Sequence, residues 1–385
     1  MAKRSRLLFV GLLLLVGGAC GGNGSGDSSA ERTTMTPSEP DATSTAIADY
    51  SARGPYDVGM ITLTLADDRP VDVWYPAAEG ASAGVERFTH NLNDPWPDAI
   101  RAKVPPADDI VVDAYVDIAA SSDGPFPVIL ESHGFGSSRR DGANNHSHLA
   151  SWGFVVIAPE HFERNRATVI GQPVKFETLD DATVLTRALE LAQEESATTG
   201  SPLEGAVDAT QVAVDGISAG GRAALEFGAD ARIDAVIARA PAGPDAFDPP
   251  PQVPVLIIAS DNDSLVELPQ VEAIYEQLAP PRRLAVILKG GHNTFSDSCA
   301  QIREGGGLDI AVLSEATGFP PALLEAGNNG CTEEYTDPTL VWPLISHLQV
   351  AHIRAALGLD PDDSALDAGY IAERFPGLLA EYRSE

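Results

Sequence analysis

The stretch VDGISAGGRAALEFG, residues 214–228, decides how the rest of the sequence is interpreted. A short apolar run leads into Gly-Ile-Ser-Ala-Gly and then into a segment with the spacing of a helix. Residues 216–220 fit the pattern G-x-S-x-G, which holds a serine on a sharp turn between a strand and a helix. Small neighbours are needed there because the backbone of such a turn is strained. Ser218 is therefore a candidate nucleophile, and the alternative is a serine in a structural turn.

Apolar segments on both sides of this stretch alternate with helical ones. We expect strands at 60–65, 71–76, 126–134, 154–160, 211–218, 233–240, 253–260 and 283–291, and helices at 144–153, 179–195 and 341–358. Strands rich in Val, Ile and Leu that alternate with helices indicate a mostly parallel sheet with helices on both faces. The first two strands are expected to form a hairpin. We interpret residues 88–123 and 300–340, which fit the alternation less well, as candidate insertions that border a pocket.

Two later strands end in groups that can activate a serine. A serine hydroxyl needs a base, and the base needs an acid that orients it. His292 follows the strand 283–291, and Asp261 and Asp263 follow the strand 253–260. Loops at the carboxyl ends of parallel strands meet at one edge of the sheet, so His292 is the candidate base. Both aspartates stay open as the acid, because residues two apart point the same way and either can organise the turn.

The loop after the strand 126–134 supplies the remaining part of the candidate site. Residues 133–136 read His-Gly-Phe-Gly, and the backbone amides of Phe135 and Ala219 are the expected oxyanion hole. One such donor typically contributes about 3 kcal/mol to stabilisation of the transition state. We interpret His133 as a brace of the loop and expect Glu160 and His161 to help line the cleft.

Seven pieces of the sequence together resemble a known family. They are RPVDVWYPA, FPVILESHGFG, LASWGFVVIAPEH, DATVLTRALELA, GISAGG, PVLIIASDND and GGHNTF, between residues 55 and 296. They resemble the α/β-hydrolases, in the branch of platelet-activating-factor acetylhydrolases, dienelactone-hydrolase-like proteins and polyester-degrading cutinases. The resemblance implies an α/β-hydrolase fold and a Ser218-His292-Asp263 triad, since the acid in that family lies five residues past the aliphatic trio 256–258.

The resemblance also implies an activity. The expected reaction is hydrolysis of a carboxylic ester through an acyl-enzyme, on a lipid acetyl ester, a short-chain ester or a polyester, without a cofactor or metal. Relatives often carry His or Trp where this chain has Ile217, so Phe135 and Ile217 are candidate substrate-binding residues. Ser218 stands where dienelactone hydrolases proper use cysteine. An amidase or peptidase with the same triad, or a binding protein on a hydrolase fold, remain alternatives.

The first 52 residues differ in character from the rest. Basic residues at positions 3, 4 and 6 precede the apolar run 7–16, which predicts an export signal. Small residues then lead to Cys20, which resembles the lipidated cysteine of bacterial lipoproteins, although Gly17 departs from that pattern. We expect a signal at 1–20, a disordered tether at 21–52 and a catalytic domain at 53–385, either lipid-anchored in the cell envelope or secreted.

Charge and cysteine content complete the expectations. The 56 acidic and 25 basic residues give a net charge of −31, which disfavours nucleic acid and anionic lipid as partners. Membrane contact is therefore expected only through the N-terminal lipid, and the protein is expected to be a monomer. Without Cys20, Cys299 and Cys331 form an even pair, which predicts a disulfide in an oxidising compartment. Two separate buried thiols are the alternative.

Overall fold

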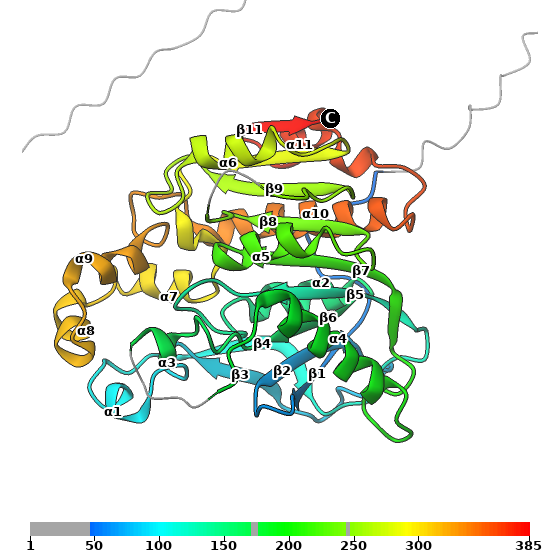
Figure 1. Cartoon of the computed structure of the whole chain (residues 1–385), viewed down its shortest axis with the longest axis horizontal. Coiled ribbons are helices and arrows are strands. Elements are labelled where there is room, and N and C mark those ends of the chain that lie inside the picture. Colours follow the sequence, from blue (N-terminus) through cyan, green and yellow to red (C-terminus); the bar gives the residue numbers. More distant parts are fainter. Residues whose placement is uncertain (1–46, 171–175, 244–246) are drawn as a thin grey trace, which may run out of the picture. The chain divides into compact units, whose positions relative to one another are not determined.

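A computed structural model describes residues 47–385 except 171–175 and 244–246, and its centre is a mixed sheet of eleven strands (Figure 1). The strand order is β11-β10-β9-β8-β7-β5-β6-β2-β1-β4-β3. The strands are β1 (Val58–Thr64), β2 (Pro70–Pro76), β3 (Arg87–Asn91), β4 (Asp109–Val116), β5 (Phe126–Ser132), β6 (Val155–Pro159), β7 (Val207–Ile217), β8 (Ala235–Arg239), β9 (Val255–Ser260), β10 (Arg282–Ile287) and β11 (Leu379–Ser384).

The central strands are parallel and the edges are mixed. Strands β6, β5, β7, β8, β9 and β10 run parallel to their neighbours in that order. The expected hairpin is confirmed, since β1 and β2 pair antiparallel with Met60 opposite Trp74. Strand β11 closes the other edge antiparallel to β10. The predicted α/β-hydrolase architecture with a mostly parallel sheet is therefore confirmed.

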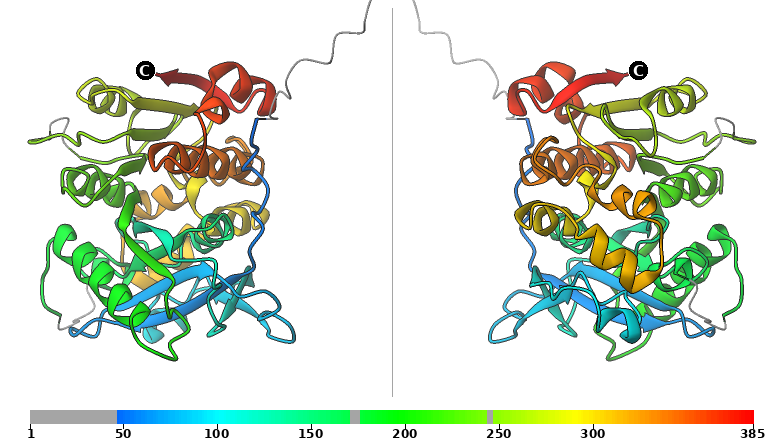
Figure 2. Two further views of the ribbon diagram at one scale, coloured as in Figure 1. Left: turned by 90° about the vertical axis from the view of Figure 1, so that its right-hand side faces the viewer. Right: turned by 90° about the vertical axis from the view of Figure 1, so that its left-hand side faces the viewer.

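Helices cover both faces of the sheet. The helices are α1 (Asp98–Arg101), α2 (Ala143–Ser151), α3 (Arg166–Val169), α4 (Asp181–Ser196), α5 (Ala219–Phe227), α6 (Leu268–Tyr275), α7 (Ser298–Glu304), α8 (Ile310–Thr317), α9 (Pro321–Leu324), α10 (Pro338–Ala356) and α11 (Ala368–Arg374). Short 3-10 turns occupy η1 (His292–Phe295), η2 (Glu325–Asn328) and η3 (Ser364–Leu366). Helices α4 and α5 lie on one side of the sheet and α2 and α10 on the other (Figure 2).

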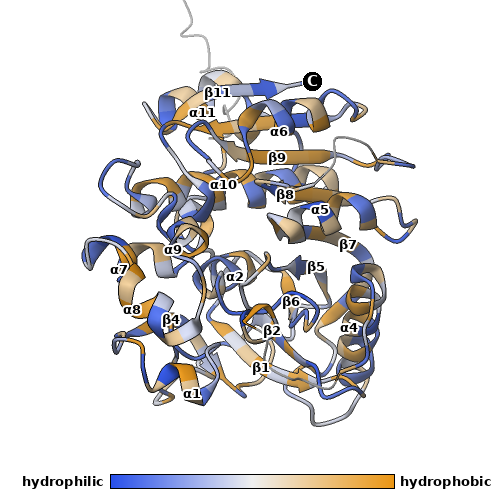
Figure 3. Ribbon diagram, turned by 60° about the vertical axis from the view of Figure 1, so that its left-hand side comes forward, coloured by the Kyte–Doolittle hydropathy of each residue, from blue (hydrophilic) through white to orange (hydrophobic). Residues whose placement is uncertain are grey.

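Alternation along the strands creates two apolar cores. In β9, Leu256 and Ile258 belong to the core that also contains α10, whereas Val255 and Ile257 belong to the core on the other face, which contains α4, α5 and α6. Both sets are fully buried, which is why the strand reads as continuously apolar and is orange in Figure 3. The sheet is thus held from both faces, and the loops at its carboxyl edge are left to form a site.

The first candidate insertion, residues 88–123, lies only partly outside the main sheet. Its ends form strands β3 and β4 of that sheet, and its middle lies outside it. That middle packs through Val104 against Leu313 and Ala316 of α8 in a small separate core. We call residues 92–108 and 298–331 the cap; its helices α1, α8 and α9 lie at one edge of the molecule (Figure 1).

The covalent and N-terminal expectations can be compared with the described residues. The predicted disulfide is present between Cys299 of α7 and Cys331. The signal, Cys20 and tether residues 21–46 lie outside the described part of the chain. The compact unit begins at Ile47, so residues 47–52 belong to the domain and not to the tether. Tyr50 explains this, because it is buried and its amide donates to His347 Nδ1 at 3.0 Å.

None of the helices in the described ranges is both long enough and apolar enough to span a bilayer.

Candidate active site

Ser218 lies on the sharp turn between β7 and α5. Its backbone has φ 56° and ψ −118°, a left-handed conformation that costs energy for a residue other than glycine. The turn is closed by hydrogen bonds from Ser218 N to Arg239 O (2.8 Å) and from Ala242 N to Ser218 O (3.0 Å). The predicted strand, turn and helix are therefore all present around this serine.

The glycines of the motif are required by close backbone approach. A Cβ on Gly216 would lie 2.2 Å from the carbonyl oxygen of Gly220. A Cβ on Gly220 would lie 1.8 Å from the carbonyl oxygen of Ser132. Since real contacts are not this short, any side chain at either position would displace the turn that holds Ser218.

His292 and Asp263 are in direct contact. His292 Nδ1 and Asp263 Oδ2 are 2.7 Å apart, and both residues are buried. The other carboxylate oxygen, Asp263 Oδ1, accepts from the amides of Leu265 (2.8 Å) and Val266 (2.9 Å), which fixes its orientation. Asp261 instead accepts from the amide of Lys289 at 2.5 Å and organises the turn after β10. The geometry therefore distinguishes the two aspartates that sequence spacing left open.

Ser218 and His292 line one cavity of about 960 Å³ together with Phe135 and Ile217. Within the described residues no hydrogen bond joins Ser218 Oγ to His292, although both face the same space. Such bonds are often long in an empty site and shorten when substrate binds. The structure thus brings four of the predicted site residues to one pocket.

The expected oxyanion donors lie at the same place. The loop carrying Phe135 touches the serine turn, because a Cβ on Gly134 would lie 3.4 Å from Ser218 Cβ. Among the described residues, neither the Phe135 amide nor the Ala219 amide has a hydrogen-bond acceptor. Ala219 also opens α5, where backbone N–H groups have no partner within the helix. Both amides are available to an oxygen bound beside Ser218.

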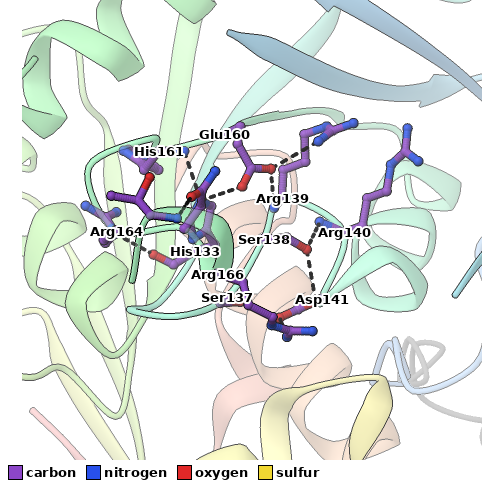
Figure 4. Close-up of polar contacts among 12 residues, drawn as sticks. His133, Ser137, Ser138, Arg139, Arg140, Asp141, Glu160, His161, Arg164 and Arg166 are labelled. Carbon is purple, nitrogen blue, oxygen red and sulfur yellow. Dashed lines mark hydrogen bonds and ion pairs between the residues drawn. The ribbon is translucent and has the colours of Figure 1, made fainter. Parts of the chain in front are cut away.

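A buried polar network holds the 133–136 loop from behind (Figure 4). His133 Nδ1 donates to Gly134 O at 2.9 Å, and His133 Nε2 accepts from the amide of His161 at 2.9 Å. Burial lowers the pKa of His133, in agreement with this neutral tautomer. Arg164 Nε donates to His133 O at 3.0 Å, and the amide of Gly136 donates to Arg164 O at 2.7 Å. His133 is thus a brace, as predicted.

One expectation about this loop is wrong. Glu160 and His161 do not line the cavity but lie behind the loop. His161 is fully buried with its Nε2 3.1 Å from Ser132 Oγ, and burial and the nearby Arg164 lower its pKa to about 3. Glu160 binds Arg139, with an Oε2–Nη1 distance of 3.0 Å. The position of Glu160 and His161 after a strand correctly predicts that they lie near the 133–136 loop. It does not predict that they lie on the side of the loop away from the cavity.

Sequence reasoning also missed a buried ion network beneath the serine turn. Arg239, at the end of β8, places Nε 2.9 Å from Asp215 Oδ1 and Nη2 2.9 Å from Glu131 Oε1. Although burial opposes ionisation, contacts with His146 and Arg239 lower the pKa of Glu131 to about 2. Because the carbonyl of Arg239 also accepts from Ser218 N, the network fixes the position of the turn. The sequence signal for this network is the presence of the charged residues Glu131, Asp215 and Arg239 within otherwise apolar strands.

Comparison with known families identifies the fold family. Residues 115–306 match the family model described as PETase: PET hydrolase-like, an α/β-hydrolase family related to cutinases and other polyester hydrolases. No curated protein matches the chain. The matched segment includes Phe135, Ser218, Asp263 and His292 and ends inside the cap, before Cys331. The chain therefore has an α/β-hydrolase fold, and its residues 115–306 are similar to the PET hydrolase-like family.

Proposed function

We propose that this protein is an exported serine esterase in which Ser218, His292 and Asp263 form the catalytic triad. The observation that carries the proposal is the shared cavity: Ser218 projects from a strained turn into the space lined by His292, whose Nδ1 contacts Asp263. The match of residues 115–306 to the PET hydrolase-like family supports ester hydrolysis in general. The assignment of the triad and of the substrate class is our proposal.

The proposed reaction proceeds through an acyl-enzyme. His292 Nε2 takes the proton of Ser218 Oγ as that oxygen attacks the ester carbonyl, and Asp263 stabilises the resulting imidazolium. The amides of Phe135 and Ala219 donate to the oxyanion. The tetrahedral intermediate collapses, the C–O bond to the alcohol breaks, and the alcohol leaves with the proton from His292. Water then attacks the acyl group with the same base, releasing the acid and restoring Ser218.

The cavity lining supports an apolar substrate. Three of the large hydrophobic side chains most exposed on the described surface line it: Phe135 (64% exposed), Leu265 (46%) and Leu323 (52%). Exposed apolar groups gathered at one opening are typical of a binding site. The cap contributes further apolar side chains, including Trp96, Leu308 and Phe319. We therefore propose an ester with at least one extended apolar group.

Charge at the cavity supports a neutral substrate. The cationic side chains that line it are already paired, Arg166 with Asp141 and Arg239 with Glu131. Asp108, Glu304 and Asp309 also line the cavity and have no ion-pair partner among the described residues. A carboxylate or phosphate on the substrate would meet this negative field without a free cation at the described part of the lining to bind it.

We also propose export and lipid attachment at Cys20. The basic and apolar N-terminal sequence supports this, and so does the Cys299–Cys331 disulfide, which suits an oxidising compartment. Growing the cells that make the protein with a labelled fatty acid, and measuring the label on the protein, tests the lipid attachment. A labelled Cys20→Ala variant would contradict the attachment site.

Active-site labelling and an ester panel test the function. We expect a fluorophosphonate to label Ser218, and Ser218→Ala and His292→Ala each to abolish turnover of p-nitrophenyl esters. Asp263→Asn should lower kcat by about 10⁴-fold, the scale seen when a triad acid is neutralised and the histidine takes the wrong tautomer.

Asp261→Asn is the matched control, because its amide oxygen can still accept from Lys289 N. We expect it to keep most of the activity. An active Ser218→Ala protein would contradict the esterase mechanism, and a larger loss in Asp261→Asn than in Asp263→Asn would move the acid.

A further inference from the structure

Asn329, in the cap, contacts the loops that carry both proposed catalytic partners. It is buried and follows η2, two residues before the disulfide cysteine Cys331. Asn329 lies 37 positions after His292 in the chain, and the family match ends before it. Its contacts therefore come from the cap and not from the matched core of the fold.

The side-chain oxygen of Asn329 binds the histidine loop. Asn329 Oδ1 accepts from the backbone amide of His292 at 2.5 Å. The backbone carbonyl of Asn329 accepts from the next amide, that of Asn293, at 2.8 Å. Two consecutive amides of the base loop are thus held by one residue, which restricts both the position and the rotation of the His292 backbone.

The side-chain nitrogen of Asn329 binds the acid loop. Asn329 Nδ2 donates to Ser264 Oγ at 2.8 Å, and Ser264 directly follows Asp263. The same nitrogen donates to Tyr335 Oη at 2.8 Å. The orientation of the amide follows from its partners, because a backbone N–H requires the oxygen and the hydroxyl groups accept from the nitrogen.

Covalent and steric contacts fix Asn329 itself. The segment 326–331 runs along the 291–294 turn so closely that a Cβ on Gly291 would lie 2.4 Å from the nitrogen of Gly330. Asn293 Nδ2 donates to Ala326 O at 2.7 Å, and Cys331 is bonded to Cys299 in α7. The cap segment is therefore anchored on both sides of Asn329.

We propose that Asn329 is a positioning residue that holds His292 and Asp263 at their hydrogen-bonding distance, and that the Cys299–Cys331 disulfide keeps it in place. The proposal rests on the esterase function proposed above. Asn329 does not line the cavity and does not touch the reacting atoms, so it acts through the two loops. Small errors in the placement of a base are costly, because proton transfer requires close alignment.

The test compares Asn329→Ala with Asn328→Ala. Asn328 is the adjacent cap asparagine; it accepts from the amide of Leu308 and donates to Glu325, and it contacts neither catalytic loop. We expect Asn329→Ala to lower kcat by about ten- to a hundredfold with KM nearly unchanged, the scale typical for loss of a supporting hydrogen bond in a site. Asn328→Ala should keep kcat within about twofold.

A spectroscopic readout separates positioning from general loosening. The proton between His292 Nδ1 and Asp263 should give a low-field resonance in wild type and in Asn328→Ala, and the resonance should broaden or disappear in Asn329→Ala. If Asn329→Ala fails to fold, Ser264→Ala serves instead, because Ser264 is exposed and its loss removes only the acid-loop contact. We expect Ser264→Ala to lower kcat severalfold.

Reduction of the disulfide tests the second part. Reduction should lower kcat in wild type but add little to the loss in Asn329→Ala, because both changes release the same contact. Additive losses would overturn the role given to the disulfide. A folded Asn329→Ala protein with wild-type kcat, or equal losses in both asparagine variants, would overturn the role of Asn329. Failure of wild type to react with a fluorophosphonate would instead contradict the esterase function.

Discussion

Asp297 directly precedes α7, and its buried carboxyl group lies at the start of α2. Its Oδ2 accepts from the amide of Asn144 at 2.7 Å, so it caps a helix whose own N-cap residue, Gly142, has no side chain to do so. Burial raises the pKa of Asp297 to about 7, because this contact only partly replaces the lost water. Around neutral pH the capping group is therefore partly protonated.

This raised pKa predicts a pH-dependent stability. The unfolded chain has an ordinary aspartate pKa near 3.9, so between about pH 4 and pH 7 the folded protein holds a proton that the unfolded chain has lost. As the pH rises through that window, the contribution of Asp297 to the free energy of unfolding should fall by at most about 1.4 kcal/mol per pH unit. Above about pH 7 the contribution should stay constant. Asp297→Asn keeps the acceptor for Asn144 N and removes the titration.

Denaturant unfolding at pH 5 and pH 8 measures the effect. We expect the stability of Asp297→Asn relative to wild type to increase from pH 5 to pH 8. An equal difference at both values would mean that Asp297 titrates normally.

Residues differ in how far the sequence predicts them. Ser218 and His292 are predictable because each follows an apolar strand and carries reactive chemistry. Asp263 needed the family resemblance, since Asp261 occupies an equivalent place in the pattern. Asn329 and Arg239 were not predicted. Their roles are hydrogen bonds and ion pairs to groups remote in sequence, and such contacts leave no local periodicity.

Elements were predictable where their burial is continuous. The strands β5 to β10 and the helices α2, α4 and α10 were all expected, with small shifts at their ends, because both faces of the sheet are covered. The edge strand β11 was missed since none of its residues is fully buried and its sequence LAEYRS is polar. Strand β4 was missed although Ile110, Val112 and Ala114 alternate inward, because Pro and Asp dominate the sequence before it.

The cap gives a prediction about substrate length. Leu323 of α9 is half exposed and lines the cavity, so Leu323→Asn should weaken contact with a long acyl chain while leaving the fold intact. We expect KM for p-nitrophenyl octanoate to rise severalfold and KM for the acetate ester to stay unchanged, as removal of apolar contact to a few methylene groups requires.

Leu340→Asn in α10 is the control, because Leu340 is also exposed but lies outside the cavity lining. Its octanoate KM should match wild type. Equal rises for acetate and octanoate in Leu323→Asn would contradict binding of the acyl chain under the cap.

The chain has far more acidic side chains than basic side chains that could form ion pairs with them. Every ion pair within the described residues uses an arginine or a histidine as the cation, and the complete chain has only four lysines. Arginine suits this role because its planar group binds two carboxylates at once, as Arg239 does beneath the site. The remaining acidic groups, with a net charge of −31 over the chain, create a negative field around the cavity.

This field predicts a substrate preference that depends on salt. p-Nitrophenyl hexanoate and the p-nitrophenyl monoester of adipic acid have acyl chains of equal length, but only the second carries a carboxylate. We expect kcat/KM to be lower for the adipate at low ionic strength, because the field repels the anion and no unpaired cation is available at the described lining.

Salt tests whether the field causes this preference. Raising the salt from 0.01 M to 1 M shortens the screening length from about 30 Å to about 3 Å, so the ratio of kcat/KM for the adipate to kcat/KM for the hexanoate should move toward one. The hexanoate measured at each salt concentration corrects for general effects of salt on the enzyme. A ratio that stays constant would show that local contacts of the adipate carboxylate, and not the field of the molecule, decide the preference.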